Sequence, residues 1–272
     1  EGKSLMKSDT GVVKSAVYNG KPVALKTLLY KTDGSELPEL IEETSAVCKL
    51  SSPHIIQYYG YFLVREKYYL KILMQHAPKG TLHDLIHKKI KDAKLAHEAK
   101  TKLSDSRVLF QIAKSVALGL QYLHSQGIIH RNLKTQHVLI QDDWMSQIGI
   151  DLKHCYYLKE NELETPAGIG SIGLPQYKSP EEFANDRQSQ KVDIYSYAVL
   201  LCELYSKKKP WRDTVSAKIC QKVLHEQQRP DLPEGVPSGI IDLISDCWKQ
   251  NAAERPTIDE VIERLNMVEA TL

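Results

Sequence analysis

The segment IIHRNLKTQHVLI, residues 128–140, places polar side chains between two apolar runs. The amide of Asn132 can hydrogen-bond a hydroxyl group, but it has no charge and no useful basicity. The imidazole of His137 is a poor match for Mg²⁺, a hard cation that prefers oxygen ligands. A carboxylate, Asp151, follows in the segment GIDLK and could bind such a cation if its side chain reached the same place. These residue types therefore suit hydroxyl and metal chemistry only in part.

A second pair of charged residues stands earlier in the chain. Lys26 ends the apolar stretch VALK, and Glu43 lies within the helical pattern LPELIEETSAVCKL, residues 37–50. The lysine could contact phosphate groups while the glutamate holds it in place. Alternatively, the two side chains form only a salt bridge that tethers the helix to the strand. Both roles can hold together.

Strand patterns dominate the first third of the chain. Residues 11–29 contain two β-rich runs joined at Asn19-Gly20, a dipeptide that favours a tight hairpin turn. Residues 54–64 and 67–75 predict a second pair of strands. These runs indicate a sheet that carries Lys26, with the helix of Glu43 beside it.

Helical patterns take over from about residue 81. Residues 108–127 predict an amphipathic helix, because Leu109, Ile112 and Val116 share one face and Gly127 suits a C-terminal cap. Further helices are predicted over residues 192–206, 239–250 and 258–268. A small β-rich part followed by a larger helical part indicates the α+β class.

The composition narrows the class of protein. A charged fraction of 26% and a formal net charge of +2 fit neither a disordered chain nor a strongly basic nucleic-acid binder. Five cysteines without a C-x-x-C pair favour an intracellular, cytoplasmic setting. No apolar run approaches the roughly 18–20 residues that a membrane span needs. The chain begins at Glu1 rather than methionine, so we expect a domain of a longer protein.

Six motifs, in order along the chain, carry a resemblance to a known family. They are VALK with Lys26, Glu43 in the following helix, His130-Arg131-Asn132-Leu133-Lys134, Ser179-Pro180-Glu181, Asp193, and Cys247-Trp248 followed by Arg255-Pro256. Together they resemble the protein kinase superfamily, and their wording is closest to the tyrosine-kinase-like and tyrosine kinase groups. Chance similarity does not produce six such motifs at compatible spacing.

The resemblance implies a bilobal kinase-like fold of the α+β class. It has a small β-rich N-lobe with one main helix and a larger, mostly helical C-lobe. We expect one domain over residues 1–272, with the N-lobe and hinge at 1–76 and the C-lobe at 77–272. An architectural ion pair between Glu181 and Arg255 is also implied. By resemblance, the residues around a bound nucleotide would be Val13, Ala24, Lys26, Glu43, Met74, His76 and Leu139.

Three positions depart from the kinase pattern. Asn132 replaces the catalytic aspartate, and His137 replaces a magnesium-binding asparagine. Ile150 replaces the metal-binding aspartate, while Asp151 falls one residue late and should point to the opposite face of a strand. A one-residue insertion in the turn QDDWMS, residues 141–146, would restore Asp151 to the site. Without that insertion, no catalytic or metal-binding residue remains.

These departures favour a pseudokinase without enzymatic activity, a scaffold or allosteric switch with weak or absent ATP binding. Its partners would be proteins, such as a kinase or a signalling complex, and neither nucleic acid nor a membrane span is expected. One alternative is an atypical kinase of low activity that uses Asp151 as its metal ligand. Another is a nucleotide sensor that binds ATP without magnesium.

Overall fold

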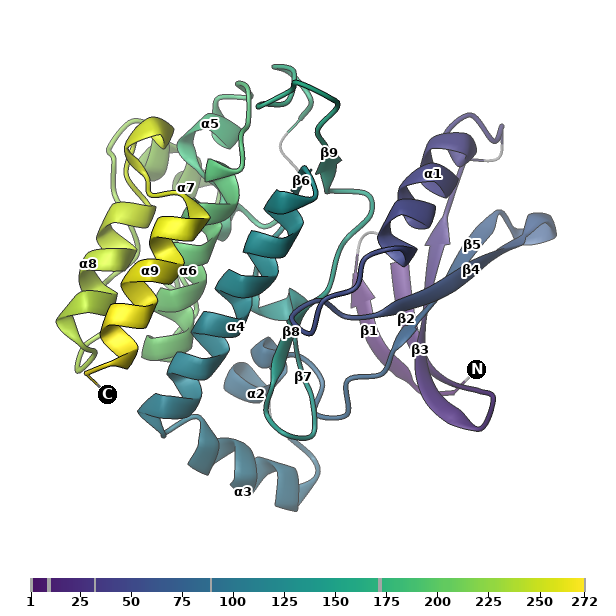
Figure 1. Ribbon diagram of the computed structural model, residues 1–272, viewed down its shortest axis with the longest axis horizontal. Helices are drawn as coiled ribbons and strands as arrows, with labels where there is room; N and C mark the ends of the chain where they lie inside the picture. Colours follow the sequence, from purple (N-terminus) through teal and green to yellow (C-terminus); the bar gives the residue numbers. More distant parts are fainter. Residues whose placement is uncertain (1, 9–10, 32, 89, 171–172, 272) are drawn as a thin grey trace.

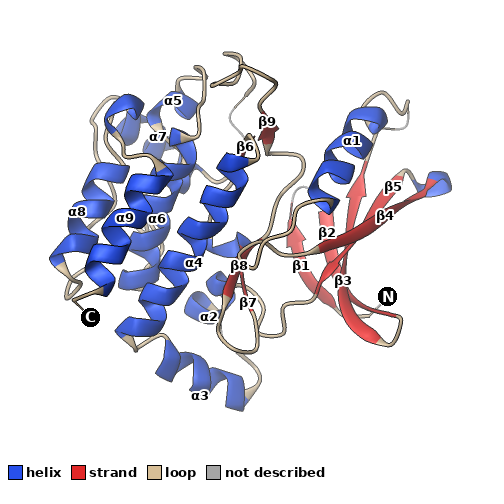
Figure 2. Ribbon diagram, viewed as in Figure 1, coloured by secondary structure: helices blue, strands red, loops and turns tan. Residues whose placement is uncertain are grey.

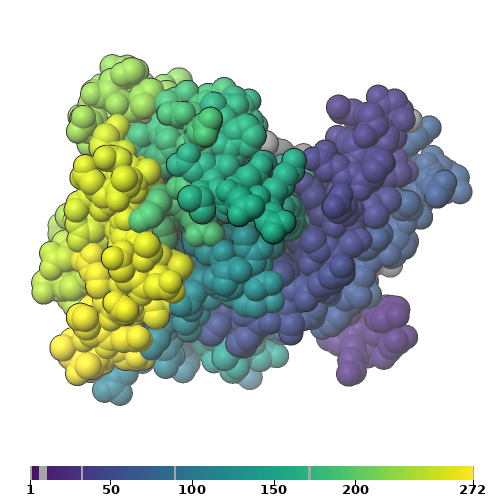
Figure 3. All heavy atoms as spheres, turned by 45° about the horizontal axis from the view of Figure 1, so that its top comes forward, coloured from purple at the N-terminus to yellow at the C-terminus, as the bar shows by residue number. Residues whose placement is uncertain are grey.

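The computed structural model describes residues 2–8, 11–31, 33–88, 90–170 and 173–271. A five-stranded sheet with one helix lies at one end of the molecule, and a larger group of helices lies at the other (Figures 1 and 2). The space-filling view shows the same order, with the purple and blue N-terminal lobe apart from the yellow C-terminal helices (Figure 3). The predicted α+β class and bilobal arrangement are confirmed. The residue limits of the domain and its lobes stay a prediction.

The sheet is antiparallel and its strand order is β1-β2-β3-β5-β4. Its strands are β1 (Ser4–Ser8), β2 (Gly11–Tyr18), β3 (Lys21–Leu29), β4 (Tyr58–Val64) and β5 (Tyr69–Gln75). The predicted hairpin joins β2 to β3, where Asn19 and Gly20 have φ angles of 50° and 75°, as a tight turn requires. The register pairs Val13 with Lys26 and Ala24 with Met74. Cross-strand partners and alternate residues share a face, so these four side chains lie on one side of the sheet.

Helix α1 (Leu37–Cys48) accompanies the sheet (Figure 1). A proline at its first turn has a φ angle suited to a helix start. Its buried side chains are Leu40, Thr44 and Val47, which recur at helical spacing. This stripe attaches the helix to the sheet and leaves Glu39 and Glu42 exposed.

The C-terminal lobe is built around two long helices. Helix α4 buries the predicted apolar stripe and ends just before Gly127, whose φ of 69° fits a C-terminal cap. Helix α6 is buried on nearly every side over residues 192–204, which makes it the centre of the lobe. The helices are α2 (Leu82–His87), α3 (Ala93–Lys102), α4 (Ser106–Ser125), α5 (Pro180–Phe183), α6 (Lys191–Ser206), α7 (Ser216–Leu224), α8 (Ser238–Cys247) and α9 (Ile258–Glu269). Among the described residues, no helix combines the length and apolar character needed to cross a bilayer.

Short strands and 3-10 turns lie between the longer elements. They are β6 (Ile128–Ile129), β7 (Val138–Ile140), β8 (Ser146–Ile148), β9 (Tyr156–Tyr157), and the 3-10 turns η1 (Arg65–Lys67), η2 (Thr135–His137), η3 (Pro175–Tyr177) and η4 (Ala252–Glu254). The polar loop therefore lies between strands β6 and β7, as the sequence predicts.

The implied ion pair between Glu181 and Arg255 is present. Two guanidinium nitrogens of Arg255 donate to the two carboxylate oxygens of Glu181 over 2.6 and 2.8 Å. The Arg255 side chain is fully buried, so this bidentate contact fixes α5 to the segment before α9.

Candidate functional site

A cavity of about 210 Å³ lies between the sheet and the segments that follow strand β5. Most of the predicted nucleotide-contacting residues line it, namely Val13, Ala24, Lys26, Met74, His76 and Leu139. Glu43 is not among the lining residues. The sheet register brings the first four to one face, and β7 supplies Leu139 from the opposite side. The walls are therefore apolar, with Lys26 as the cation at one end.

Lys26, at the polar end of the cavity, forms a buried ion pair with Asp151, which is not itself among the lining residues. The Lys26 Nζ lies 3.0 Å from Asp151 Oδ1, and their side chains are only 7% and 4% exposed. The other carboxylate oxygen, Asp151 Oδ2, accepts a hydrogen bond from Asn132 Nδ2 over 3.4 Å. The Nδ1 of His154 lies 3.1 Å from the same oxygen. Asp151 therefore faces Lys26 and Asn132 instead of pointing away from the site.

The expectation that Asp151 points away from the site is wrong. It assumed that the alternation of side chains in a strand continues to residue 151. Strand β8 ends at Ile148, and residues 149–151 have no regular strand structure. The backbone is instead held by Tyr58, whose hydroxyl accepts from the Ile150 amide over 2.8 Å and donates to the Ile150 carbonyl over 3.0 Å. The Gly149 amide also donates to the His137 carbonyl over 2.8 Å. These bonds fix a path in which Asp151 faces Lys26.

Electrostatics keep the Asp151 carboxylate ionised. Burial alone would raise its pKa, but the Lys26 ammonium and the nearby His154 imidazole outweigh burial. The pKa of Asp151 is therefore held below its usual range. An ionised carboxylate next to the residues that line the cavity is suited to binding a cation.

The expected pairing of Lys26 with Glu43 is absent from the described part of the chain. Burial raises the pKa of Glu43 to about 7, with further contributions from Glu39 and Glu42 on the same helix. The backbone carbonyl of Glu43 accepts a hydrogen bond from the Tyr157 hydroxyl over 3.2 Å. Since Lys26 is engaged by Asp151, the tether between helix and strand that the sequence suggested is not formed.

A residue of helix α6, Asp193, holds the loop that follows β6. The two carboxylate oxygens of Asp193 accept hydrogen bonds from the backbone amides of His130 and Arg131, each over 2.8 Å. Arg131 also contacts the segment before helix α5, because its guanidinium donates a hydrogen bond to the Gly170 carbonyl over 2.8 Å. The frame of the loop is therefore supported by charged hydrogen bonds.

Asn132 and His137 are linked within this loop. The Nδ1 of His137 donates to the backbone carbonyl of Asn132 over 2.8 Å, which leaves its Nε2 as a neutral acceptor. Burial lowers the pKa of His137 well below its ordinary value. The side-chain oxygen of Asn132 faces Gly173, where an added Cβ would lie only 2.7 Å away. The backbone at Gly173 therefore lies close to the side-chain amide of Asn132.

Several functional candidates escape sequence reasoning. His154 reaches Asp151 from three residues further on, in a turn whose geometry no motif predicts. Asp84 lines the cavity from α2, where its carboxylate could accept hydrogen bonds from ligand hydroxyl groups. Tyr58 also belongs here, because its hydroxyl sets the backbone path to Asp151. Only Asp84 had a visible signal, as an acid in the first turn of a capped helix.

The chain is similar in sequence to known protein kinases along most of its length. Residues 2–265 match the family described as protein tyrosine and serine/threonine kinase. The chain is 28% identical over 254 residues to dual specificity protein kinase shkB of Dictyostelium discoideum, covering 92% of this chain and 37% of that protein. It is 27% identical over 265 residues to megakaryocyte-associated tyrosine-protein kinase of Mus musculus, covering 97% and 48%. The chain thus spans less than half the length of these relatives.

A third relative is probable serine/threonine-protein kinase SIS8 of Arabidopsis thaliana, 29% identical over 266 residues, with 95% of this chain and 24% of that protein covered. Because relatives along nearly the whole chain are named as protein kinases, the expectation that the chain is not an enzyme is contradicted. Membership of a kinase family also implies ATP binding, typically with a metal ion. The chain belongs to the protein tyrosine and serine/threonine kinase family.

Proposed function

We propose that the chain is a protein kinase domain that transfers the terminal phosphate of ATP to a hydroxyl group of a protein. The observation that carries this proposal is that Lys26, which lines the cavity, forms a buried ion pair with Asp151. A cation for phosphate and an ionised carboxylate for a metal are the charges that phosphoryl transfer needs in one place.

The cavity suits a nucleotide along its whole length. Ala24 on the sheet and Leu139 on β7 offer apolar surfaces for a planar base, and His76 follows at the segment after β5. Lys26 lies beyond them, where its ammonium would bind phosphate oxygens. Asp84 lies among the lining residues as an acceptor for ribose hydroxyl groups.

The residues present fit one magnesium ion better than two. The ionised Asp151 carboxylate is a hard oxygen ligand and would hold the ion, whereas the free nitrogen of His137 prefers softer metals. When bound, magnesium neutralises charge on the transferring phosphate. Lys26, the partner of Asp151, would orient the phosphates from the other side.

Asn132 would orient the acceptor hydroxyl rather than deprotonate it. Its amide can accept a hydrogen bond from the hydroxyl, but it cannot take up the proton, which must leave to a phosphate oxygen or to water. Phosphoryl transfer depends more on positioning than on a base, so we expect a slow reaction rather than none. The five free cysteines also support the proposed reducing, intracellular setting, with protein substrates as partners.

A second candidate is a nucleotide sensor that binds ATP without metal. The observation in its favour is that Asp151 is already surrounded by Lys26, Asn132 and His154. A metal must compete with these contacts, whereas ATP phosphates could reach Lys26 without one. Both candidates share the same base-binding walls.

A thermal-shift titration with ATP distinguishes the two candidates. A ligand at about 100 times its Kd stabilises a protein by about 2.7 kcal/mol, which corresponds to several degrees in Tm. The kinase proposal predicts a shift that needs magnesium and is lost in Asp151→Asn. The exposed Asp142 lies in the β7–β8 turn, and Asp142→Asn serves as the matched control with an unchanged shift. A shift of equal size in chelator favours the sensor, and no shift at millimolar ATP refutes both.

A further inference from the structure

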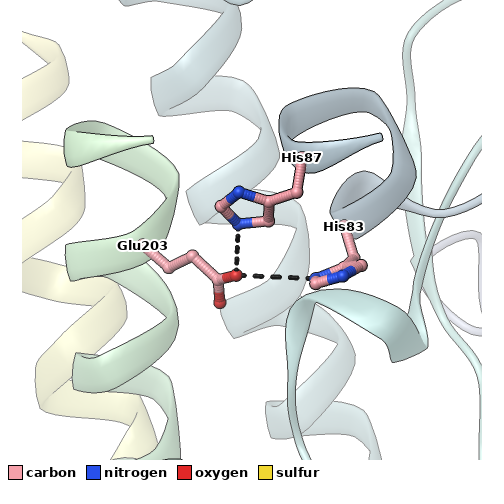
Figure 4. Close-up of side chains that lie close together, drawn as sticks. All are labelled: His83, His87 and Glu203. Carbon is pink, nitrogen blue, oxygen red and sulfur yellow. Dashed lines mark hydrogen bonds and ion pairs between the residues drawn. The ribbon is translucent and has the colours of Figure 1, made fainter. Parts of the chain in front are cut away.

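A second group of ligand-type side chains lies in the C-terminal lobe, apart from the nucleotide cavity. His83 and His87 project from helix α2 toward Glu203 of helix α6 (Figure 4). Their ligand atoms all lie within 4.8 Å of one another. None of the three has a part in the proposed reaction.

The spacing along α2 explains why the two imidazoles converge. Residues four apart on a helix share a face, so His83 and His87 stand one above the other, with ring centroids 4.8 Å apart. The Nε2 of His87 lies 2.7 Å from Glu203 Oε1, and the Nδ1 of His83 lies 3.7 Å from the same oxygen. Figure 4 shows both rings directed at that carboxylate.

Glu203 is a buried carboxylate that has no lysine or arginine partner in the part of the chain that the structure describes. Its side chain is 1% exposed, and within the described ranges its ion-pair partners are the two imidazoles alone. Burial of a carboxylate is costly unless a cation compensates it. A metal ion between the three side chains would supply that charge and leave both histidines neutral.

The surrounding hydroxyl groups hold the ligands in place. The Tyr177 hydroxyl donates to the other oxygen of Glu203, which leaves Oε1 directed at the imidazoles. The Thr135 hydroxyl lies 3.3 Å from His83 Nδ1 and 3.4 Å from the Tyr177 hydroxyl. The Tyr177 contact would orient the carboxylate as outer contacts do in known metal sites, whereas the Thr135 hydroxyl must turn away from His83 Nδ1 when that nitrogen binds the metal.

We propose that His83, His87 and Glu203 form a binding site for a transition metal ion of the zinc class. Two histidines and one carboxylate are a ligand set that zinc favours, with a fourth position left for water. Ligand atoms of a tetrahedral zinc ion lie about 3.4 Å apart. The observed separations from Glu203 Oε1 are 2.7 and 3.7 Å, and all three ligand atoms lie within 4.8 Å, so side-chain shifts of about 1 Å would bring them to that spacing. His83 is 15% exposed, which gives the ion and its water a path from solvent.

The site would pin helix α2, which borders the nucleotide cavity, to the central helix α6. Thr135, which contacts His83, follows the loop that carries Asn132. Tyr177, which contacts Glu203, belongs to the turn before helix α5. The proposal does not depend on kinase activity, because it concerns binding and stability only.

The test is a titration of the purified chain with Zn²⁺ and, separately, with Co²⁺. We expect one Zn²⁺ per chain after dialysis, a raised Tm, and the visible absorption of tetrahedral Co²⁺ without thiolate charge-transfer bands. His83→Asn and His87→Gln should each weaken binding at least about tenfold. His225 is exposed and distant in sequence, so His225→Gln should bind as the unmodified chain does.

Other outcomes overturn the proposal. No metal retained by the unmodified chain means that the cluster is only a hydrogen-bonded ion pair. Equal binding by the folded His83→Asn variant, whose residue is partly exposed, assigns the metal elsewhere. Thiolate bands with Co²⁺ assign it to cysteines. Circular dichroism of each variant shows that lost binding is not lost folding.

Discussion

Replacing Asp151 by asparagine keeps the size of the side chain and removes its charge. The Lys26 ammonium then stays buried, with 7% of its side chain exposed, and loses its carboxylate partner. Because the structure offers Lys26 no other ion pair within the described residues, this substitution should strongly destabilise the fold.

The expected loss in the free energy of unfolding follows from the burial of the Lys26–Asp151 pair. Removing one partner of a buried ion pair typically costs about 3–5 kcal/mol, because an uncompensated charge remains. The asparagine oxygen can still accept a hydrogen bond from Lys26, so we expect a loss near the lower limit, about 3 kcal/mol. At roughly 2–4 °C for each kcal/mol, Tm should fall by about 6–12 °C.

Urea denaturation of a double-mutant cycle measures this loss. The variants are Asp151→Asn, Lys26→Met and the two combined. Lys26→Met also removes the buried ammonium, so the double variant should be more stable than the sum of the single losses by about 1–3 kcal/mol. A loss below about 1 kcal/mol for Asp151→Asn, or strict additivity, would refute the buried pair.

Acid should weaken the same pair. The pKa of Asp151 is lowered in the folded chain, so its contribution is present above the unfolded value of 3.8 and is lost as pH falls through the folded value. The unmodified chain should therefore lose its advantage over Asp151→Asn as pH falls below about 4. A stability difference that stays constant down to acid unfolding would contradict this sign.

Three further predictions concern single side chains around the site. Glu43 has its pKa raised from 4.5 to about 7, so stability should fall as pH rises through that window, and Glu43→Gln should flatten the pH profile of Tm; an unchanged slope contradicts it. Asn132→Asp places a carboxylate 3.4 Å from Asp151 and should lower Tm, yet raise the phosphotransfer rate at least about tenfold by restoring a base; a rate equal to that of the unmodified chain argues against the role given to Asn132. Gly173→Ala puts a Cβ 2.7 Å from the Asn132 oxygen at a φ of 101°, so it should cost about 1–3 kcal/mol in denaturation, and a neutral result would place the segment elsewhere.

The fold was accessible to sequence reasoning because its regular elements carry regular patterns. Alternation and the Asn19-Gly20 turn predict the β2–β3 hairpin, and strand register then places Val13, Ala24 and Met74 on one face. The bidentate pair of Glu181 and Arg255 followed from the family resemblance and is present.

The polar end of the site was not accessible in the same way. Asp151 lies three residues beyond the end of β8, where alternation no longer applies and the Tyr58 hydroxyl decides the path. Whether Glu43 meets Lys26 depends on how α1 sits against the sheet, which local sequence does not determine. The misplacement of Asp151, together with the departures at Asn132 and His137, led to the expectation of an inactive protein, which the kinase-named relatives contradict.

The histidine cluster shows the same limit. The spacing of His83 and His87 is visible in the sequence, but Glu203 follows 116 residues after His87. Only the packing of α2 beside α6 brings the carboxylate to the imidazoles (Figure 4). Tertiary contacts, rather than propensity, define both polar sites.

Phosphate transfer itself tests the central claim most directly. The purified chain is incubated with magnesium and ATP labelled at the terminal phosphate, and incorporation into the chain and a generic protein substrate is followed over time. We predict slow, magnesium-dependent incorporation that falls at least about 100-fold in Asp151→Asn and in Lys26→Met, and is retained in Asp142→Asn. No incorporation above background, or equal incorporation by the Asp151→Asn variant, would contradict the account.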